Sequence, residues 1–349
     1  MAAVPSRPQL FAQFHGEDAF ARLEPQEWQA LGIDNLVLRV FRNQSEQGGV
    51  LFNNPEFRVV KPLLRPFLSK MNDSGPAIWG WMIARRFDWL KDPRYLDRQS
   101  TGSGLEVIPR LDLFNPGAVK RIVAVYGDLA QSGITGIMIQ DDLVLRSREG
   151  LSSWGRAKFS LETGIPAQIS SMLDPRYGAH AHWVEFKNRQ VAMVLARIVD
   201  RCKSQNPNIQ VGLNLYYETP LQPKKSRNWY AHDLDLLLGT GIDRVFLMAY
   251  HRQIAAELGL STAAAIEFFG RLIRQAMESC QDKLVVKVQC RDWKTGAWLP
   301  DSELDAILDR IPPGVGGICL TPVSWDDLPR VQRLLARRGW RADVSREKQ

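Results

Sequence analysis

Residues 134–142 read Ile-Thr-Gly-Ile-Met-Ile-Gln-Asp-Asp, an apolar, β-branched run that ends in two adjacent acids. A run of this length and composition is typical of a strand that is buried on both faces, as strands are in a parallel sheet. Seven further runs of the same kind occur, at residues 9–15, 34–41, 77–83, 209–216, 243–250, 283–290 and 315–321. The sequence therefore predicts eight buried strands.

Segments with helical periodicity follow most of these strands. The best-defined ones lie at residues 55–73, 116–132, 184–205, 228–239, 261–280, 301–311 and 325–338. Strand–helix repeats of this number predict an α/β protein with a closed (β/α)₈ fold, a TIM barrel, as a single domain over residues 1–340 with a frayed tail at 341–349. A doubly wound open sheet is the alternative, because a strand count does not establish closure, but no Gly-x-Gly-x-x-Gly follows the first strand.

The composition indicates a folded globular chain and few special partners. Of the 349 residues 45% are hydrophobic and 24% are charged, which excludes a disordered or collagen-like chain. The net charge of +7 is spread along the sequence, so we expect no nucleic acid partner. No run approaches the roughly 18 apolar residues of a membrane span, and the first residues lack the apolar core of a signal peptide. The four cysteines are far apart and form no Cys-x-x-Cys pair, so we expect no metal site and no cofactor.

Two long insertions interrupt the repeat, at residues 84–115 after the third strand and 143–183 after the fourth. Both leave the carboxyl ends of strands, where the active-site loops of a barrel lie. Long loops without clear secondary structure are usually functional or mobile. We therefore expect the chemistry of this protein at that end of the barrel.

Polar and aromatic side chains gather at the same strand ends. The candidates for substrate binding are His15, Arg39, Trp81, Asn214, Tyr216, Tyr250, Asp292 and Trp293. They include no Ser-His-Asp arrangement and no glycine loop for phosphate. Each aromatic residue taken alone also fits core packing, but together they provide the flat, partly polar surfaces on which sugars stack. The set indicates a carbohydrate ligand.

Cleavage of a glycosidic bond usually needs two carboxyl groups, one as the acid and one as the nucleophile or base. Asp141 and Asp142 are neighbours, and neighbouring side chains of an extended chain point to opposite sides. We therefore expect one of them to be the acid and the other to orient it or to anchor a loop. The second carboxylate would come from Asp292, Glu149 or Glu218. Alternatively, the two aspartates cap the following turn through backbone N–H groups.

The segment from Gly136 to Glu149 resembles the Asp-Asp motif of one family, the C-terminal glycoside hydrolase domain of the poly-β-1,6-N-acetyl-D-glucosamine deacetylase PgaB. Further similar segments occur in the same order over nearly the whole chain, at Ala77–Met82, Arg110–Pro116, Trp183–Lys187, Asn214–Tyr216 and Val288–Trp293. Three segments depart from the family pattern: Gln140 replaces a frequent histidine, Arg146-Ser-Arg148 with Gly150 replaces the acidic tail of the motif, and the sixth strand ends in Met248-Ala-Tyr-His251.

The resemblance implies a (β/α)₈ barrel that binds and hydrolyses partially de-N-acetylated poly-β-1,6-N-acetylglucosamine, an exopolysaccharide of biofilms. It implies catalytic roles for Asp141 and Asp142, with Glu149 at a nearby acidic position, and a groove lined by Asn214, Tyr216, Asp292 and Trp293. It further implies an oligosaccharide or polysaccharide partner, contacts with exopolysaccharide synthesis or export proteins, and a location in the bacterial cell envelope or periplasm.

Two questions stay open at this point. A non-catalytic barrel that binds glycan during polysaccharide modification or export would use the same aromatic residues, and a barrel of other chemistry also fits the fold. The charge of the preferred sugar is open as well. Asp142, Glu149 and Asp292 favour a glucosamine ammonium group, whereas Arg39, Arg42, Arg85 and Arg86 favour an acidic sugar if they face the groove.

Overall fold

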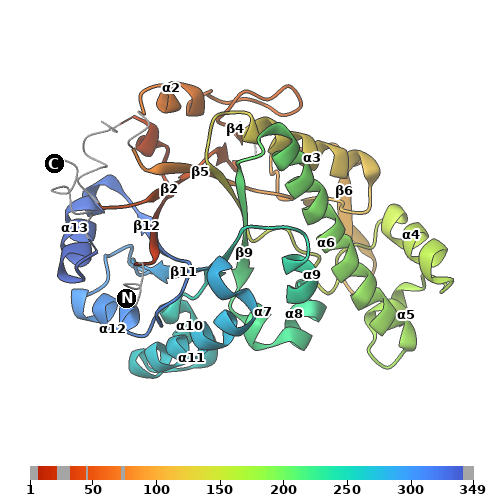
Figure 1. The fold of residues 1–349 in the computed structure, drawn as a ribbon. Coiled ribbons are helices and arrows are strands. Elements are labelled where there is room, and N and C mark those ends of the chain that lie inside the picture. Colours follow the sequence, from red (N-terminus) through yellow and green to blue (C-terminus); the bar gives the residue numbers. More distant parts are fainter. Residues whose placement is uncertain (1–6, 22–31, 45, 72–74, 341–349) are drawn as a thin grey trace.

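Eight parallel strands close into a barrel in the computed structural model, which describes residues 7–21, 32–44, 46–71 and 75–340. Around the barrel they follow the order β1, β2, β5, β8, β9, β10, β11 and β12 (Figure 1). Their bounds are β1 Gln9–Phe14, β2 Asn35–Arg39, β5 Ala77–Met82, β8 Gly136–Ile139, β9 Gln210–Tyr216, β10 Arg244–Met248, β11 Leu284–Gln289 and β12 Gly317–Val323. All eight predicted strands are confirmed, and closure decides against the open sheet.

Helices surround the barrel on its outer side (Figure 1). The longer ones are α3 Pro116–Ala130, α4 Ser153–Thr163, α6 Gly178–Gln205, α10 His251–Leu258, α11 Thr262–Cys280, α12 Asp301–Leu308 and α13 Leu328–Arg337. The shorter ones are α2 Leu64–Leu68, α5 Ile169–Leu173, α7 Glu218–Leu221, α8 Pro223–Trp229 and α9 Leu234–Leu238, with 3₁₀ turns η1 Glu17–Phe20, η2 Gln281–Lys283 and η3 Trp325–Asp327. Side-chain caps start several of these helices, among them Asn115 for α3 and Ser261 for α11.

Two predicted helices are wrong in extent. The helix expected at 55–73 is reduced to the five residues of α2, because Pro62 and Pro66 remove backbone donors that a longer helix needs. The helix expected at 228–239 is split into α8 and α9, and Ala231 between them has a positive φ of 56°. Asp233 then starts α9 by accepting from the N–H of Leu236. Helix α10 was not predicted.

The two long insertions are structured, contrary to the expectation of loops without secondary structure. Residues 84–115 contain an antiparallel hairpin of β6 Leu96–Ser100 and β7 Leu105–Leu111. Residues 143–183 contain α4, α5 and the first turn of α6. A second small ladder pairs β3 Phe41–Arg42 with β4 Gly49–Val50. The predicted tail at 341–349 lies outside the described residues.

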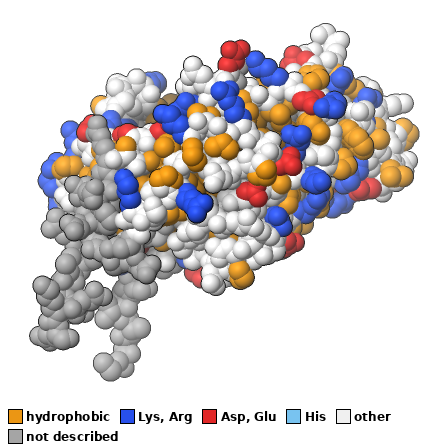
Figure 2. All heavy atoms as spheres, turned by 90° about the horizontal axis from the view of Figure 1, so that it is seen from above, with side chains coloured by type: hydrophobic (Ala, Val, Ile, Leu, Met, Phe, Trp, Pro, Cys, Tyr) orange, Lys and Arg blue, Asp and Glu red, His pale blue; other side chains and the backbone are white. Residues whose placement is uncertain are grey.

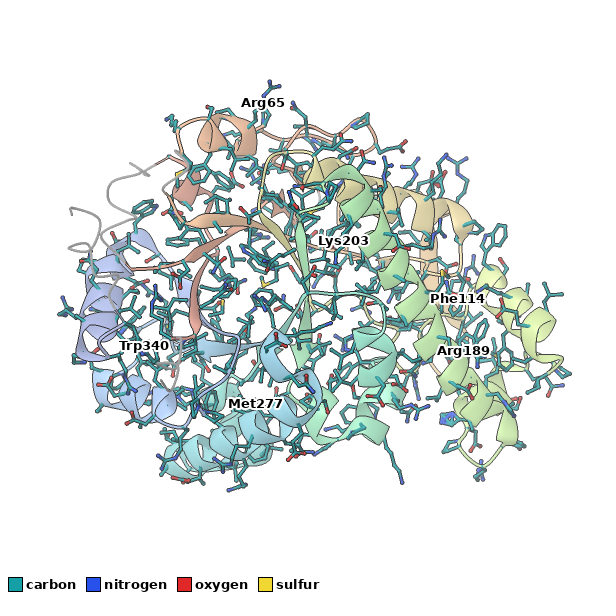
Figure 3. All side chains as sticks on the ribbon, viewed as in Figure 1. Arg65, Phe114, Arg189, Lys203, Met277 and Trp340 are labelled. Atoms are coloured by element: carbon teal, nitrogen blue, oxygen red, sulfur yellow. The ribbon has the colours of Figure 1, made fainter. Side chains whose placement is uncertain are left out.

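Side chains fill the interior of the barrel (Figure 3). The lower layer is apolar and consists of Phe11, Val37, Trp79, Met138, Phe246, Val285 and Cys319. Gly136 and Gly212 make room for it, because a Cβ would lie 2.3 Å from the Trp79 ring at the first position and 2.5 Å from the Phe246 ring at the second. Strand side chains alternate, so the next inward layer is two residues further along each strand.

That next layer is largely polar and forms the floor of the barrel mouth. Its members are Gln13, Arg39, Trp81, Gln140, Asn214, Met248, Lys287 and Thr321. The outer surface carries basic, acidic and apolar side chains in mixture on the face shown in Figure 2, in line with the spread-out charge of the sequence. The four cysteines are buried and free.

Candidate active site

A cavity of about 390 Å³ opens at the carboxyl ends of the strands, directly above the polar layer. Its lining is made of carboxylates, amides, aromatic rings and one lysine. These residues are Gln13, His15, Trp81, Asp141, Asn214, Tyr216, Tyr217, Glu218, Tyr230, Met248, Tyr250, Gln253, Glu257, Lys287 and Trp293. Seven of the eleven predicted site residues lie here: His15, Trp81, Asp141, Asn214, Tyr216, Tyr250 and Trp293.

Asp141 is held at the edge of this cavity by a tyrosine of the next strand. The hydroxyl of Tyr216 donates to Asp141 Oδ2 at 2.8 Å. The Tyr216 ring lies flat against the Tyr230 ring, with centroids 4.3 Å apart and planes 16° from parallel. The hydroxyl of Tyr230 donates in turn to Glu218 Oε1 at 3.3 Å. Two carboxylates of one cavity are thus connected through a pair of stacked phenols.

Glu218 is buried, and its carboxyl group can accept more hydrogen bonds than it does. Besides Tyr230, Lys225 lies 3.7 Å from its Oε1. Its other oxygen, Oε2, is buried without a partner among the described residues. A buried carboxylate oxygen without a hydrogen bond is costly, which suggests that a ligand or water completes it.

Asp142 has a different environment from its neighbour. Its two oxygens accept the backbone N–H groups of Ala84, Arg85 and Arg86 at 2.7–2.8 Å. Burial raises the pKa of Asp142, and these three N–H groups partly offset the effect. The side chain is absent from the cavity lining and instead fastens the segment that follows β5. The aspartates therefore point apart, and the N–H groups bound by Asp142 belong to another loop rather than to the following turn.

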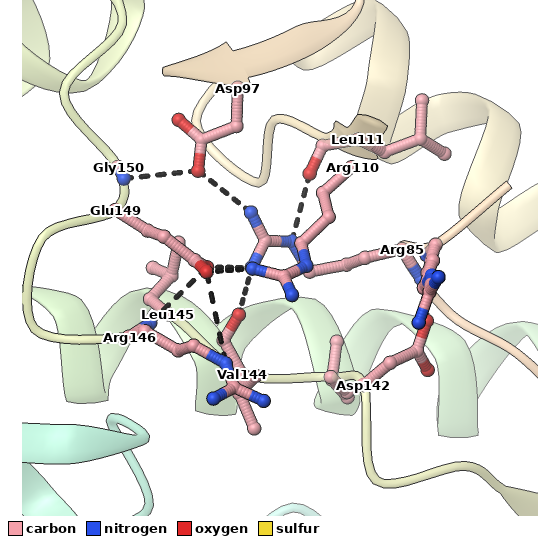
Figure 4. Close-up of polar contacts among 12 residues, drawn as sticks. Arg85, Asp97, Arg110, Leu111, Asp142, Val144, Leu145, Arg146, Glu149 and Gly150 are labelled. Carbon is pink, nitrogen blue, oxygen red and sulfur yellow. Dashed lines mark hydrogen bonds and ion pairs between the residues drawn. The ribbon is translucent and has the colours of Figure 1, made fainter. Parts of the chain in front are cut away.

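Glu149 belongs to a buried ion cluster away from the cavity (Figure 4). Arg85 is fully buried and donates to Glu149 Oε2 at 2.9 Å and to Asp97 Oδ2 at 2.7 Å. Arg110 also binds the Glu149 carboxylate. Burial raises the pKa of Glu149, but Arg85 and Arg110 outweigh it and leave the pKa below its usual range. All of these groups tie the hairpin β6–β7 to the segment after β8.

His15, Arg39 and Trp81 form an aromatic and cationic cluster at the ends of β1, β2 and β5. The His15 ring lies 4.8 Å from the Trp81 ring, and its Nε2 is 3.3 Å from Thr321 Oγ1. Desolvation and the charges of Lys287 and Arg39 lower the pKa of His15 to about 3, so this ring is neutral at pH 7. Arg39 lies over Phe41 at 4.5 Å and is not part of the cavity lining.

Asp292 lies outside the central cavity, in a neighbouring cavity of about 490 Å³. It accepts from Arg252 at 2.6 Å and from the backbone N–H groups of Lys294 and Thr295. These bonds lower the pKa of Asp292 to about 2. Trp293 lines both cavities, and its exposed ring meets Tyr250 edge-on at 5.5 Å. Of these two neighbours, Trp293 therefore reaches the central cavity and Asp292 does not.

Sequence reasoning did not single out Lys287, Glu257 or Gln13. For Lys287 a signal was present, since it is the one charged residue inside the apolar run 284–288. Glu257 is on α10, which was not predicted. Gln13 interrupts an apolar first strand as Lys287 interrupts the seventh.

The polar layer of the barrel, of which Gln13 and Trp81 line the cavity, contains several buried polar atoms without partners. Within the described part of the chain these include Gln13 Oε1, Arg39 Nε, Trp81 Nε1 and Gln140 Oε1, all from the polar layer. Buried polar atoms are normally hydrogen-bonded, so such a cluster indicates a polar ligand or ordered water. No group of three or more His, Cys, Asp or Glu residues suitable for a metal ion occurs among the residues described. None of the described helices has the length and apolarity that crossing a membrane requires.

A TIM barrel with aromatic rings and carboxylates around the mouth is the architecture of a glycoside-hydrolase-like protein. Residues 78–314 match the model of hypothetical glycosyl hydrolase family 13 (GHL13), and the chain belongs to that family. No curated protein sequence matches this chain.

Solved structures of carbohydrate-active barrels share the fold. The PgaB (BpsB) glycoside hydrolase domain from Bordetella bronchiseptica has 21% identity and a TM-score of 0.76, covering 94% of this chain and 98% of that one. The cold-adapted β-galactosidase from Rahnella sp. R3 has 12% identity and a TM-score of 0.62, covering 96% of this chain and 56% of that one. At these identities the likeness establishes the fold alone, and it confirms the fold that the sequence resemblance to PgaB implies.

Proposed function

We propose that this protein hydrolyses a partially de-N-acetylated β-1,6-N-acetylglucosamine polymer, with Asp141 and Glu218 as its pair of carboxyl groups. The observation that carries the proposal is that both carboxylates line one cavity at the barrel mouth and are connected through Tyr216 and Tyr230. Glycosidic cleavage requires such a pair on the two sides of one bond.

The hydrogen bonds suggest different roles for the two groups. Tyr216 donates to Oδ2 of Asp141 and fixes the orientation of this carboxyl group at the edge of the cavity. Asp141 then serves as the nucleophile or base. Glu218 has an oxygen without a partner, from which a proton can pass to the glycosidic oxygen as the bond from that oxygen to the anomeric carbon breaks. The sequence-based expectation placed the acid at Asp141 or Asp142, and we now assign it to Glu218.

Two of the acids predicted from the sequence have no part in this proposal. Both oxygens of Asp142 are occupied by backbone donors, and Glu149 is enclosed by Arg85 and Arg110. Neither side chain lines the cavity. Their contacts support structural roles.

The charges around the cavity favour an amino sugar over an acidic one. Three carboxyl groups line it, those of Asp141, Glu218 and Glu257. With Glu218 protonated as the proposed acid, two carboxylates remain against the single ammonium of Lys287. Three of the four arginines that the sequence analysis left open are engaged in ion pairs: Arg42 pairs with Glu17, Arg85 with Asp97 and Glu149, and Arg86 with Asp88. The fourth, Arg39, lies over the Phe41 ring and is not part of the cavity lining. In a partly desolvated cleft this excess of negative charge attracts a glucosamine ammonium group.

The test is product analysis on a polymer series with increasing removal of acetyl groups, beside a uronic acid polymer of similar length. We expect new reducing ends from the partly de-N-acetylated polymers and none from the acidic one. The variants D141N and E218Q serve as matched controls that keep side-chain size. Binding without cleavage by the wild type would contradict hydrolysis and favour the non-catalytic glycan-binding barrel. Cleavage of the acidic polymer alone would contradict the amino-sugar assignment.

A further inference from the structure

Lys287 lies where a lysine is least expected, in the middle of a buried strand. Its side chain points into the barrel between Val285 of the apolar layer and Gln289, and the residue is 2% exposed. Its Nζ forms no ion pair with any carboxylate of the described residues. A buried ammonium group without a counter-ion is costly, and an apolar side chain at this position would avoid that cost. A lysine occupies this position in spite of the cost of burying its ammonium group, which indicates a role for Lys287 in the cavity that it lines.

Two contacts define the position of this ammonium group. Its Nζ donates to Asn214 Oδ1 at 2.9 Å and lies 5.8 Å from the centre of the Tyr250 ring. The titratable groups that act on it from the surrounding strands are Asp141 after β8, Cys319 of β12 and His15 after β1. Burial lowers the pKa of Lys287 to about 8. The group therefore keeps most of its charge at pH 7.

The contact with Asn214 has a consequence for the amide. An ammonium group only donates, so the atom that faces it must be the amide oxygen. The amide nitrogen of Asn214 is then fixed on the other side, and both residues line the cavity. Lys287 has three N–H donors and spends one on Asn214. This part of the floor thus presents donors to the ligand.

We propose that Lys287 is a positioning and specificity-determining residue: it holds the amide of Asn214 with Nδ2 toward the cavity, and the two residues together bind an acceptor oxygen of the sugar. The inference rests on the proposed function of the cavity. Replacement of Lys287 by methionine distinguishes two explanations of this residue. If Lys287 serves stability, the variant melts at a lower temperature and keeps its KM. If Lys287 serves substrate binding, the variant keeps its melting temperature and its KM rises.

The experiment compares K287M, N214A and the double variant with the wild type, using partially de-N-acetylated β-1,6-linked N-acetylglucosamine pentasaccharide. Thermal melting gives stability, turnover gives kcat and KM, and calorimetry gives binding to the same oligosaccharide. K283M is the matched control, since Lys283 lies just before the start of β11 and donates to the Ile242 carbonyl.

We expect K287M to melt at the same temperature as the wild type or higher, because methionine removes a buried charge at similar volume. We expect its KM to rise ~10-fold or more, as for a lost charged hydrogen bond. N214A should raise KM similarly, and the double variant should be no worse than ~3-fold beyond the poorer single variant, because the two act as a unit. K283M should leave KM unchanged.

A K287M protein with a lower melting temperature and an unchanged KM would overturn this inference and leave the proposed function intact. Multiplicative effects of K287M and N214A would overturn it as well. A wild type that neither binds nor cleaves the oligosaccharide overturns both the proposed function and this inference, and that result is visible before any variant is made.

Discussion

The hydroxyl of Tyr216, the last residue of β9, donates a hydrogen bond of 2.8 Å to Oδ2 of Asp141, two residues beyond the end of β8. Asp142 next to it faces the other way and accepts three backbone N–H groups. One adjacent pair of acids thus contains a group aimed at the cavity and a group that fastens a loop. The two aspartates should respond differently to substitution.

The first prediction separates the two aspartates. D141N should lower kcat by ~10²-fold or more with little change in melting temperature, because it removes a group of the proposed chemistry and no structural contact beyond Tyr216. D142A should lower the free energy of unfolding by on the order of 3 kcal/mol, because it leaves backbone donors without a partner. Denaturant titration and steady-state kinetics measure both. Equal losses of activity per folded molecule in the two variants would contradict the assignment.

The second prediction concerns the stacked phenols. Y216F keeps the ring against Tyr230 but loses the bond to Asp141. We expect kcat/KM to fall ~10-fold, in line with about 1.4 kcal/mol for a hydrogen bond to a charged group. Y177F is the control, because Tyr177 is exposed and is not part of the cavity lining, and it should leave kcat/KM unchanged.

The third prediction distinguishes Glu149 from Glu218, both of which the sequence analysis named as candidates for the second carboxylate. E218Q should abolish most turnover and leave stability nearly unchanged. E149Q should do the reverse, lowering the free energy of unfolding by about 3 kcal/mol because Arg85 loses a buried partner. Steady-state kinetics at a temperature where E149Q is folded measures whether this variant keeps its turnover. Loss of turnover in folded E149Q would restore a catalytic role to Glu149.

The fourth prediction is a pH dependence of stability. The pKa of Lys287 is about 8 in the folded protein against 10.5 when unperturbed, so the unfolded state binds the proton more tightly. The resulting loss of stability, on the order of 3 kcal/mol, is fully present below pH 8 and disappears as the pH rises toward 10.5. The wild type should therefore gain stability relative to K287M over this range. A difference that stays constant from pH 7 to 10 would show that Lys287 does not carry this shift.

The sequence predicted the barrel well because its signal is local. Strands buried on both faces must be apolar, so each appears as a run such as residues 134–140 or 283–290. The position of Asp141 at the barrel mouth was predicted for the same reason, since this residue follows such a run directly. The helix at 228–239 was mispredicted because its interruption at Ala231 depends on the packing of Tyr230 beside the mouth.

The composition of the site could be predicted only in part, because its pairs are distant in sequence. Asn214 and Lys287 are 73 residues apart. Asp141 and Glu218 meet through Tyr216 and Tyr230, and no local pattern marks Glu218 above Glu149. The difference between these two acids arises from Arg85, whose burial no segment around residue 149 reveals.

The ion cluster of Figure 4 has a mechanical consequence if the protein acts on a polymer, as proposed above. Arg85, Asp97 and Glu149 join the segments after β5 and β8, and Lys187 of α6 adds a bond to the Arg146 carbonyl. These contacts connect the two segments, so this side of the mouth is closed by one continuous set of side chains. Under the proposed function, such an edge would hold successive sugar units in one position, and any widening that releases a long chain would occur on the opposite side, where the exposed Trp293 lines two cavities.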